Sequence, residues 1–309
     1  MPLSVEVVSA IHDLELAARL VVEGLRRGGE RSPFLGIGAE FRQHRPYQIG
    51  DELKHVDWKV SARHDRLLTR QLRETTNASV LLVLDTSASM AFPDGVHQKF
   101  RYAQIACAAL AWVALDQGHA VGLLTAVPDA RVASGTRLVY VAPRSGVLHR
   151  RALLAAIAQL TAQGTWPAAR TVQRASTLLR RRGVLVVVSD FYDDEEAVRR
   201  ALAEAARRGH DVRQWQVVAP EERELPPGGP QELEDLETGG RRLVDRRTLG
   251  DAYAMAHRAF VERCRIGAQR DGVVWASLDT SVAPERALRD LLRGAPLAGP
   301  ATPRIAARA

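Results

Sequence analysis

The sequence has few cysteines, few lysines and no long apolar run. Cys107 and Cys264 are too few for a disulfide framework or a cysteine-rich metal site, and both lie in apolar helical patterns typical of buried free thiols. The longest apolar run, residues 105–115, is far shorter than the ~20 residues that span a bilayer. Glu6 and Asp13 stand where a secretion signal would be apolar. These absences exclude disulfide-rich and membrane-spanning classes and favour a soluble, cytoplasmic protein without membrane insertion.

The basic surplus is spread along the chain. Lys and Arg number 43 against 36 Asp and Glu, a net charge of +7, and all but three of the basic residues are arginine. Both signs are interspersed, which is typical of a solvated surface, whereas a nucleic-acid-binding domain concentrates its basic residues. The composition therefore does not favour a nucleic-acid partner.

The first quarter of the chain differs from the rest. Residues 11–27 carry apolar residues at three- and four-residue spacing, which predicts an amphipathic helix that ends at two glycines. Residues 28–76 contain glycines and prolines among dense charges, which indicates an irregular segment with short strands. We therefore expect an N-terminal helix and irregular segment at 1–76, a main domain at 77–282, and a closing helix with a flexible tail at 283–309.

From residue 78 onward, apolar strands alternate with helices. Residues 79–84 and 183–189 are continuously apolar, as expected of strands buried on both faces of a sheet. The pattern predicts further strands at 120–126, 138–142, 212–218 and 273–278, helices at 100–115, 147–160, 171–181, 194–208, 249–270 and 284–293, and a surface excursion or hairpin at 226–240. Such alternation predicts an α/β fold with a doubly wound, mostly parallel sheet and helices on both faces. Ligands of such sheets bind beyond the carboxyl ends of the strands.

Each of the two most apolar strands ends in an aspartate. Asp85 follows the first strand and precedes hydroxyl groups at Ser87 and Ser89, while Asp190 follows the second strand. Thr165 offers a further hydroxyl in a loop between them. Oxygen ligands of this kind suit Mg²⁺ or Mn²⁺, and the absence of histidine and cysteine here argues against zinc. The simpler interpretation is that Asp and Ser after a strand only cap the next helix; the second aspartate and the Gly-Thr pair favour the metal site.

The run D-T-S-A-S at residues 85–89 resembles the metal-ion-dependent adhesion site of von Willebrand factor A domains. In that family this motif, a threonine from a later loop and an aspartate after a later strand surround one divalent cation. The resemblance covers about residues 77–282 and implies the ligands Asp85, Ser87, Ser89, Thr165 and Asp190. Thr165 departs from the usual Gly-Gly-Thr context, because glutamine precedes Gly164 in this sequence.

The segment before the Asp85 strand resembles the bacterial "domain of unknown function 58" family. The ordered motifs are G-I-G-A-E-F-R at 36–42, R-P-Y-Q-I-G-D at 45–51, V-D-W-K at 56–59 and S-A-R at 61–63, and S-D-F follows at 189–191. The resemblance implies a von Willebrand factor A-like domain that is often encoded beside a MoxR-type AAA+ ATPase. Some members carry N-terminal membrane helices, and this sequence shows none, so we expect a cytoplasmic member.

The signature segment allows two interpretations. Aromatic and charged side chains alternate there and are typical of partner-docking surfaces; the candidates are Arg45, Tyr47, Asp51, Asp57, Trp58, Lys59 and Arg63. The alternative, which we favour slightly, is an ion-pair network that fixes an irregular segment.

Three functions follow from these residues. The first is a non-enzymatic protein-binding module in which Mg²⁺ or Mn²⁺ takes a carboxylate from a partner; the family resemblance suggests a MoxR-type ATPase as that partner, in chaperone-like assembly or maturation of other proteins. The second is a structural scaffold with a degenerate metal site. The third is an aspartyl-phosphate phosphatase using Asp85, which is disfavoured because the position two residues later is Ser87 rather than a second acid.

Overall fold

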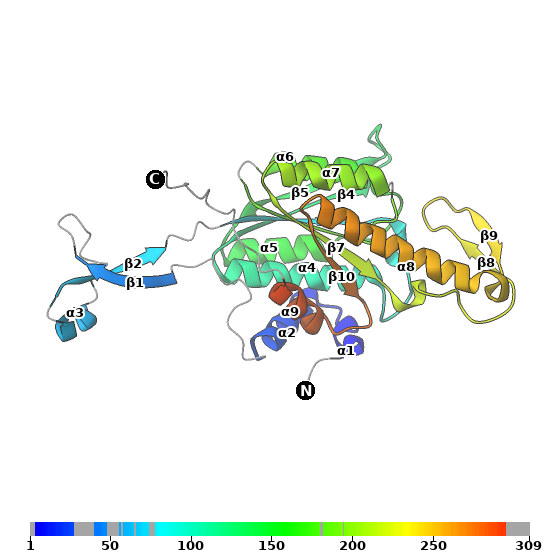
Figure 1. Cartoon of the computed structure of the whole chain (residues 1–309). Coiled ribbons are helices and arrows are strands. Elements are labelled where there is room, and N and C mark those ends of the chain that lie inside the picture. The colour runs from blue at the N-terminus through cyan, green and yellow to red at the C-terminus, as the bar shows by residue number, and fades with distance from the viewer. Residues whose placement is uncertain are drawn as a thin grey trace.

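A six-stranded sheet forms the centre of the protein (Figure 1). The computed structural model describes residues 4–27, 40–47, 56, 58–64, 66–73, 78–179, 182–193 and 195–294. The strands of the sheet are β3 (Ser79–Leu84), β4 (Ala120–Pro128), β5 (Thr136–Arg144), β6 (Val184–Ser189), β7 (Asp211–Val218) and β10 (Val274–Asp279). Their order is β10-β7-β6-β3-β4-β5, and neighbouring strands are parallel except for β5, which pairs antiparallel with β4 at one edge. The predicted α/β fold with a mostly parallel sheet is confirmed.

Helices cover both faces of the sheet, because successive residues of the buried strands point to opposite sides. Val80, Leu82 and Leu84 of β3 belong to one core, and Leu81 and Val83 to the other. The first core is covered by α2 (Leu14–Arg27), α4 (Lys99–Asp116), α5 (Val147–Ala158) and α9 (Pro284–Gly294). The second core is covered by α6 (Ala168–Leu178), α7 (Glu195–Arg207) and α8 (Arg246–Arg270). Helix α4 is apolar nearly all round because it lies between the sheet and the helices α2, α5 and α9.

Side-chain caps move two helix starts from their predicted positions. The first turn of α2 begins at Leu14 rather than residue 11, because the Asp13 carboxylate accepts hydrogen bonds from the Glu15 and Leu16 backbone amides. The short helix α1 (Val5–Ser9) precedes it. Helix α8 begins three residues earlier than predicted, because Asp245 accepts a hydrogen bond from the Arg247 amide. Polar caps, rather than apolar periodicity, decide these boundaries.

Two smaller strand pairs accompany the central sheet. Strands β1 (Glu40–Pro46) and β2 (Leu68–Arg73) pair antiparallel, with α3 (Trp58–His64) beside them, and Figure 1 shows this unit apart from the central sheet. The predicted excursion at 226–240 includes β8 (Gln231–Glu234), whose hairpin partner β9 (Arg241–Val244) lies just beyond the predicted range; this hairpin lies near the beginning of α8 (Figure 1). Two short 3₁₀ helices, η2 (Ala88–Ala91) and η3 (Pro220–Glu222), follow β3 and β7.

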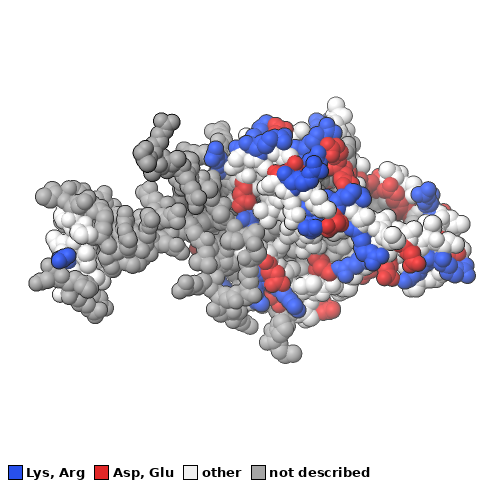
Figure 2. Space-filling model, in the orientation of Figure 1, with Lys and Arg blue, Asp and Glu red and all other residues white. Residues whose placement is uncertain are grey.

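The prediction that both cysteines are buried free thiols is confirmed. None of the helices described is long and apolar enough to cross a bilayer. On the face shown in Figure 2, acidic and basic side chains are intermingled rather than gathered into one basic field.

Candidate metal centre

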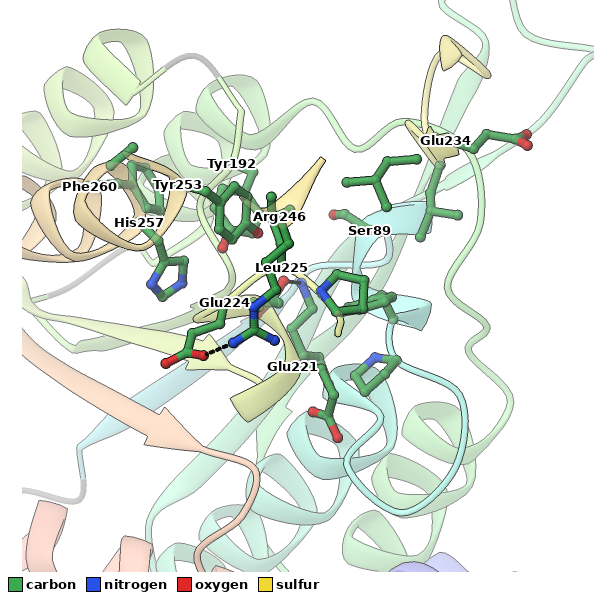
Figure 3. A pocket seen from close by; sticks show the side chains of 18 of the residues that line it. Ser89, Tyr192, Glu221, Glu224, Leu225, Glu234, Arg246, Tyr253, His257 and Phe260 are labelled. Atoms are coloured by element: carbon green, nitrogen blue, oxygen red, sulfur yellow. Dashed lines mark hydrogen bonds and ion pairs between the residues drawn. The ribbon is translucent and has the colours of Figure 1, made fainter. Parts of the chain in front are cut away.

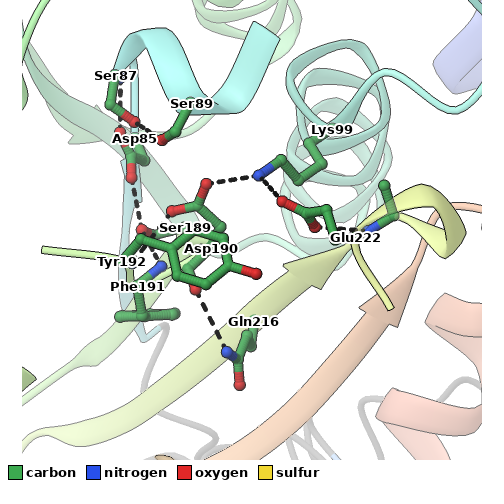
Figure 4. Close-up of polar contacts among 11 residues, drawn as sticks. Asp85, Ser87, Ser89, Lys99, Ser189, Asp190, Phe191, Tyr192, Gln216 and Glu222 are labelled. Carbon is green, nitrogen blue, oxygen red and sulfur yellow. Dashed lines mark hydrogen bonds and ion pairs between the residues drawn. The ribbon is translucent and has the colours of Figure 1, made fainter. Parts of the chain in front are cut away.

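The register of the sheet brings Asp85 and Asp190 to one edge. Strands β3 and β6 are parallel neighbours, with Leu84 opposite Val188, and the Asp85 amide donates to the Val188 carbonyl at 2.9 Å. The aspartate that follows each strand therefore emerges beside the other (Figure 4). Both are buried, with 3% and 2% of their surfaces exposed.

Asp85 is held by uncharged donors. Its Oδ2 accepts a hydrogen bond from Ser189 Oγ at 2.5 Å, and its Oδ1 accepts one from the Ser87 amide at 2.7 Å. The hydroxyls of Ser87 and Ser89 lie 2.9 Å apart beside it (Figure 4). Burial, together with the negative charge of Asp190, raises the pKa of Asp85 to about 7. The hydrogen bonds from Ser189 and Ser87 lower the pKa but do not cancel this increase. The surroundings of Asp85 therefore favour neutralisation of its charge, either by a proton or by a bound cation.

Asp190, in contrast, has a cationic partner. Lys99 Nζ lies 2.7 Å from Asp190 Oδ2 and 2.5 Å from Glu222 Oε1, and the lysine is 1% exposed (Figure 4). Burial alone would lower the pKa of Lys99, but the two carboxylates overcome this effect and raise it. The ammonium also lies 5.1 Å from the centre of the Tyr192 ring. The cluster of Asp85, Asp190, Glu222 and Lys99 thus contains three carboxyl groups and one ammonium.

Glu222 and Asp190 are themselves fixed in place. The second oxygen of Glu222 accepts a hydrogen bond from the Ala219 amide at 3.0 Å, at the start of η3. The Asp190 carboxylate also accepts from the Tyr192 amide at 3.3 Å, and the Asp190 carbonyl accepts from the Gln216 side chain at 3.3 Å. These bonds hold the buried ion pairs in one geometry.

The loop that carries Thr165 lies against the D-T-S-A-S loop. The Gly164 carbonyl accepts from the Ala88 amide at 2.8 Å, and the Gln163 amide donates to the Thr86 carbonyl at 2.8 Å. Gly164 has φ of 65°, a left-handed conformation in which glycine carries no steric penalty. The Thr165 side chain is exposed. The structure therefore brings the Thr165 loop against the loop that carries Asp85, Ser87 and Ser89.

The donor set fits a hard divalent cation. The part of the chain that the structure describes contains no group of three or more His, Cys, Asp and Glu residues arranged to hold a metal. The candidate centre instead offers two carboxylates, Asp85 and Asp190, with the hydroxyls of Ser87 and Ser89, and Mg²⁺ and Mn²⁺ accept such oxygen ligands. Because Asp190 already has Lys99, Asp85 is the carboxylate that a cation would neutralise.

A second D-T-S run shows which features belong to the motif alone. Asp279 is the last residue of β10 and accepts hydrogen bonds from the Ser281 amide at 2.9 Å and hydroxyl at 2.6 Å. Asp279 also pairs with Arg223. The hydrogen bond from the amide two residues later is therefore the same as at Asp85, so this turn belongs to the motif and does not by itself indicate a metal site. What distinguishes Asp85 is its burial beside a second carboxylate.

A large pocket of about 930 Å³ opens beside the centre (Figure 3). Ser89, Lys99 and Tyr192 line one side of it, and the rest of the lining comes from the residues just after η2, from the segment 221–236 that runs from η3 into the β8–β9 hairpin, and from α8. Tyr192 stacks on Phe260 of α8, with ring centres 5.0 Å apart. The sequence patterns did not predict this pocket, which forms between segments distant in the chain.

The signature-segment candidates are described only in part. Tyr47 follows β1, and its amide donates to the Leu67 carbonyl at 2.9 Å. Trp58 begins α3 and is 61% exposed. Asp51 and Asp57 lie outside the described residues, as do the side chains of Arg45, Lys59 and Arg63.

Sequence reasoning missed three residues of the centre: Lys99, Ser189 and Glu222. Lys99 had a signal, since it is one of only three lysines in an arginine-rich chain and lies six residues before the longest apolar run. Ser189 directly precedes Asp190. Glu222 lies among other acidic residues of a loop, and its sequence neighbourhood does not distinguish it.

Comparison with known proteins identifies the family. The sequence matches the family described as "Protein of unknown function DUF58" over residues 43–262. The chain belongs to the DUF58 family. It is 31% identical over 265 residues to uncharacterized proteins of Mycobacterium bovis and Mycobacterium tuberculosis, which covers 84% of this chain and 81% of each relative. The family resemblance seen in the signature motifs is confirmed.

Among solved structures, an aerotolerance-related membrane protein from Bacteroides fragilis aligns with 71% of this DUF58 chain and 100% of its own, at 16% identity and a TM-score of 0.47. The conserved hypothetical protein BatB from Bacteroides thetaiotaomicron aligns over the same shares, at 16% identity and a TM-score of 0.43.

Proposed function

We propose that this DUF58 protein binds a divalent cation, Mg²⁺ or Mn²⁺, through Asp85, Ser87, Ser89, Asp190 and Thr165. The observation that carries the proposal is the buried pair of strand-terminal carboxylates, of which only Asp190 has Lys99 beside it. A divalent cation neutralises the excess charge, and the neighbouring serine hydroxyls supply further oxygen ligands. The cation would leave a coordination position facing the pocket, because Ser89 belongs to both.

The proposed role of the cation is to bind a carboxylate from a protein partner. A charge-assisted contact in a partly desolvated site is strong and depends on the metal, so association can be switched by the cation. The family resemblance favours a MoxR-type AAA+ ATPase as the partner, with the pair acting in the assembly or maturation of other proteins. The protein itself then needs no catalytic group.

Metal binding is tested by thermal unfolding in EDTA, in 5 mM Mg²⁺ and in 5 mM Mn²⁺. A ligand that binds only the folded state raises the melting temperature. We expect a rise for the wild type and none for Asp85→Ala. Asp279→Ala is the matched control, because it removes the aspartate of the second D-T-S run, and it should keep the metal-induced rise.

Partner binding is tested with the purified MoxR-type ATPase encoded in the same genome. We expect binding in Mg²⁺, none in EDTA and none with Asp85→Ala. Equal melting temperatures with and without metal would favour the scaffold function instead. Binding of beryllium fluoride at Asp85, detected by ¹⁹F NMR, would favour the phosphatase, because this anion mimics an acyl phosphate on an aspartate.

A further inference from the structure

We infer that the pocket beside the centre is a docking site for a basic, apolar peptide segment of a protein partner. The inference goes beyond the proposed function and does not depend on bound metal. It rests on the walls of the pocket, on the charge around its mouth and on where that charge lies in the chain.

The walls of the pocket are apolar and come from three separate parts of the fold (Figure 3). Phe92 and Pro93 lie after η2, Leu233 and Leu236 belong to the hairpin, and Phe260 belongs to α8. Leu236 is 50% exposed although it faces the pocket. With a volume of about 930 Å³, the pocket is large enough for two or three side chains of a peptide.

The mouth of the pocket is acidic. Glu221, Glu224, Glu232 and Glu234 line it, and their side chains are 41–67% exposed. Each has a partner within the chain: His97 for Glu221, Arg246 for Glu224, and Arg241 for the two hairpin glutamates. Exposed carboxylates of this kind keep free lone pairs and can accept further donors from a ligand.

The charge here is opposite to that of the whole protein. Residues 220–240 contain seven acidic residues and one arginine, while the chain as a whole has a net charge of +7. In the run Glu232-Leu233-Glu234-Asp235-Leu236-Glu237, leucines recur among carboxylates, so apolar contact and negative charge occur together. Charge complementarity therefore selects a ligand with arginine or lysine next to Leu, Phe or another apolar side chain.

Two sets of immobilised octapeptides test this selection. Both sets carry Leu and Phe among Gly and Ser; one set adds Arg and Lys, and the other adds Asp and Glu at the same positions. We expect the full-length protein to bind the basic set preferentially. The best basic peptide is then labelled with fluorescein and titrated by fluorescence polarisation at 0.05 M and 0.5 M salt.

Two double variants locate the binding. Leu233→Ser with Leu236→Ser should weaken peptide binding at least tenfold at both salt concentrations, because each buried leucine contributes about a tenfold factor or more. Glu232→Gln with Glu234→Gln should weaken binding about fivefold at 0.05 M salt and less at 0.5 M salt, because salt screens exposed charges. Circular dichroism confirms that both variants fold.

Matched controls carry the same changes outside the pocket. Leu243→Ser removes a 71% exposed leucine of the same hairpin, and Glu204→Gln removes an exposed carboxylate of α7. Both should bind the peptide as the wild type does. Peptide binding by the wild type should be the same in EDTA and in 5 mM Mg²⁺, so failure of the metal proposal and failure of the pocket proposal give different results.

Three results would overturn the inference. One is equal binding of the acidic and basic peptide sets, or no binding by either. Another is a loss of binding in the control variants equal to that in the pocket variants. The third is concentration-dependent dimerisation that the pocket variants abolish, which would make a second copy of this chain the occupant.

Discussion

Replacing Lys99 with methionine tests the charge arrangement of the centre most directly. Methionine keeps the length of the side chain and removes the ammonium. The ammonium lies 2.7 Å from Asp190 and 2.5 Å from Glu222, and the three side chains are 1%, 3% and 8% exposed. The substitution therefore leaves two buried carboxylates without their shared cation.

The expected loss follows from that burial. Removing one partner of a buried ion pair costs about 3–5 kcal/mol, because a buried charge is left uncompensated. We therefore expect the free energy of unfolding of Lys99→Met to fall by about 3–5 kcal/mol. Adding Glu222→Gln should recover at least about 1 kcal/mol of this loss, because it removes one of the two uncompensated charges and glutamine can still accept from the Ala219 amide.

Urea unfolding at pH 7.5 in EDTA measures these differences. The control is Arg208→Met, which breaks an ion pair of similar length, 2.7 Å, between side chains that are 44% and 42% exposed. Exposed pairs contribute at most about 1 kcal/mol, so this control should change little. A loss for Lys99→Met as small as that of the control would refute the reasoning. So would a double variant less stable than the single one.

Three further predictions concern the fold and the metal. Gly122→Ala should lose about 1–3 kcal/mol of stability in urea unfolding, because its Cβ would lie 2.5 Å from a backbone oxygen of β5, whereas Gly229→Ala, with nothing within 4 Å, should not. Burial lowers the pKa of His119 and His210, so their neutral forms favour folding, and their contribution to stability is full above about pH 6.5 and is lost as the pH falls below it; because the raised pKa of Asp85 acts in the opposite direction, the test is a comparison, in which replacing either histidine with glutamine should raise the melting temperature at pH 5.5 relative to that at pH 7.5, compared with the wild type. The Mg²⁺-induced rise in melting temperature should also be absent in Ser87→Ala, which removes a proposed ligand.

Much of the fold is predictable because long buried elements have simple patterns. Strands β3 and β6 are continuous apolar runs, and the helix at 100–115 is apolar enough to be recognised without knowing what covers it. The ends of helices are less predictable, since Asp13 and Asp245 override the apolar periodicity by capping. The antiparallel direction of β5 depends on a short connection, which apolar patterning does not specify.

The candidate centre is predictable where its residues follow strands and unpredictable where they do not. Asp85 and Asp190 meet because parallel strands end at the same edge, and this topology follows from alternating strands and helices. Lys99 lies in α4 and Glu222 in η3, 91 and 32 residues from Asp190 along the chain. Separations of this size do not reveal that the three side chains meet in the fold. The pocket depends on three such distant segments, and no local pattern encodes its volume.

The two aspartates should respond in opposite ways to the same neutral substitution. Asp190 is compensated by Lys99, so Asp190→Asn removes one of the two charged partners of the ammonium and should lower the free energy of unfolding by about 1.5–3 kcal/mol, the contribution of a hydrogen bond between charged groups. Asp85 is buried beside Asp190, and burial raises its pKa to about 7, so its ionised form is disfavoured in the folded protein. Asp85→Asn should therefore leave stability unchanged or raise it when urea unfolding is measured in EDTA at pH 8, where the wild-type carboxyl is ionised. A divalent cation should stabilise the wild type and not Asp85→Asn. Changes of the same sign and size for the two variants in EDTA would mean that the charge of Asp85 is balanced in the apoprotein, as that of Asp190 is, so that Asp85 would have no excess charge for a cation to neutralise.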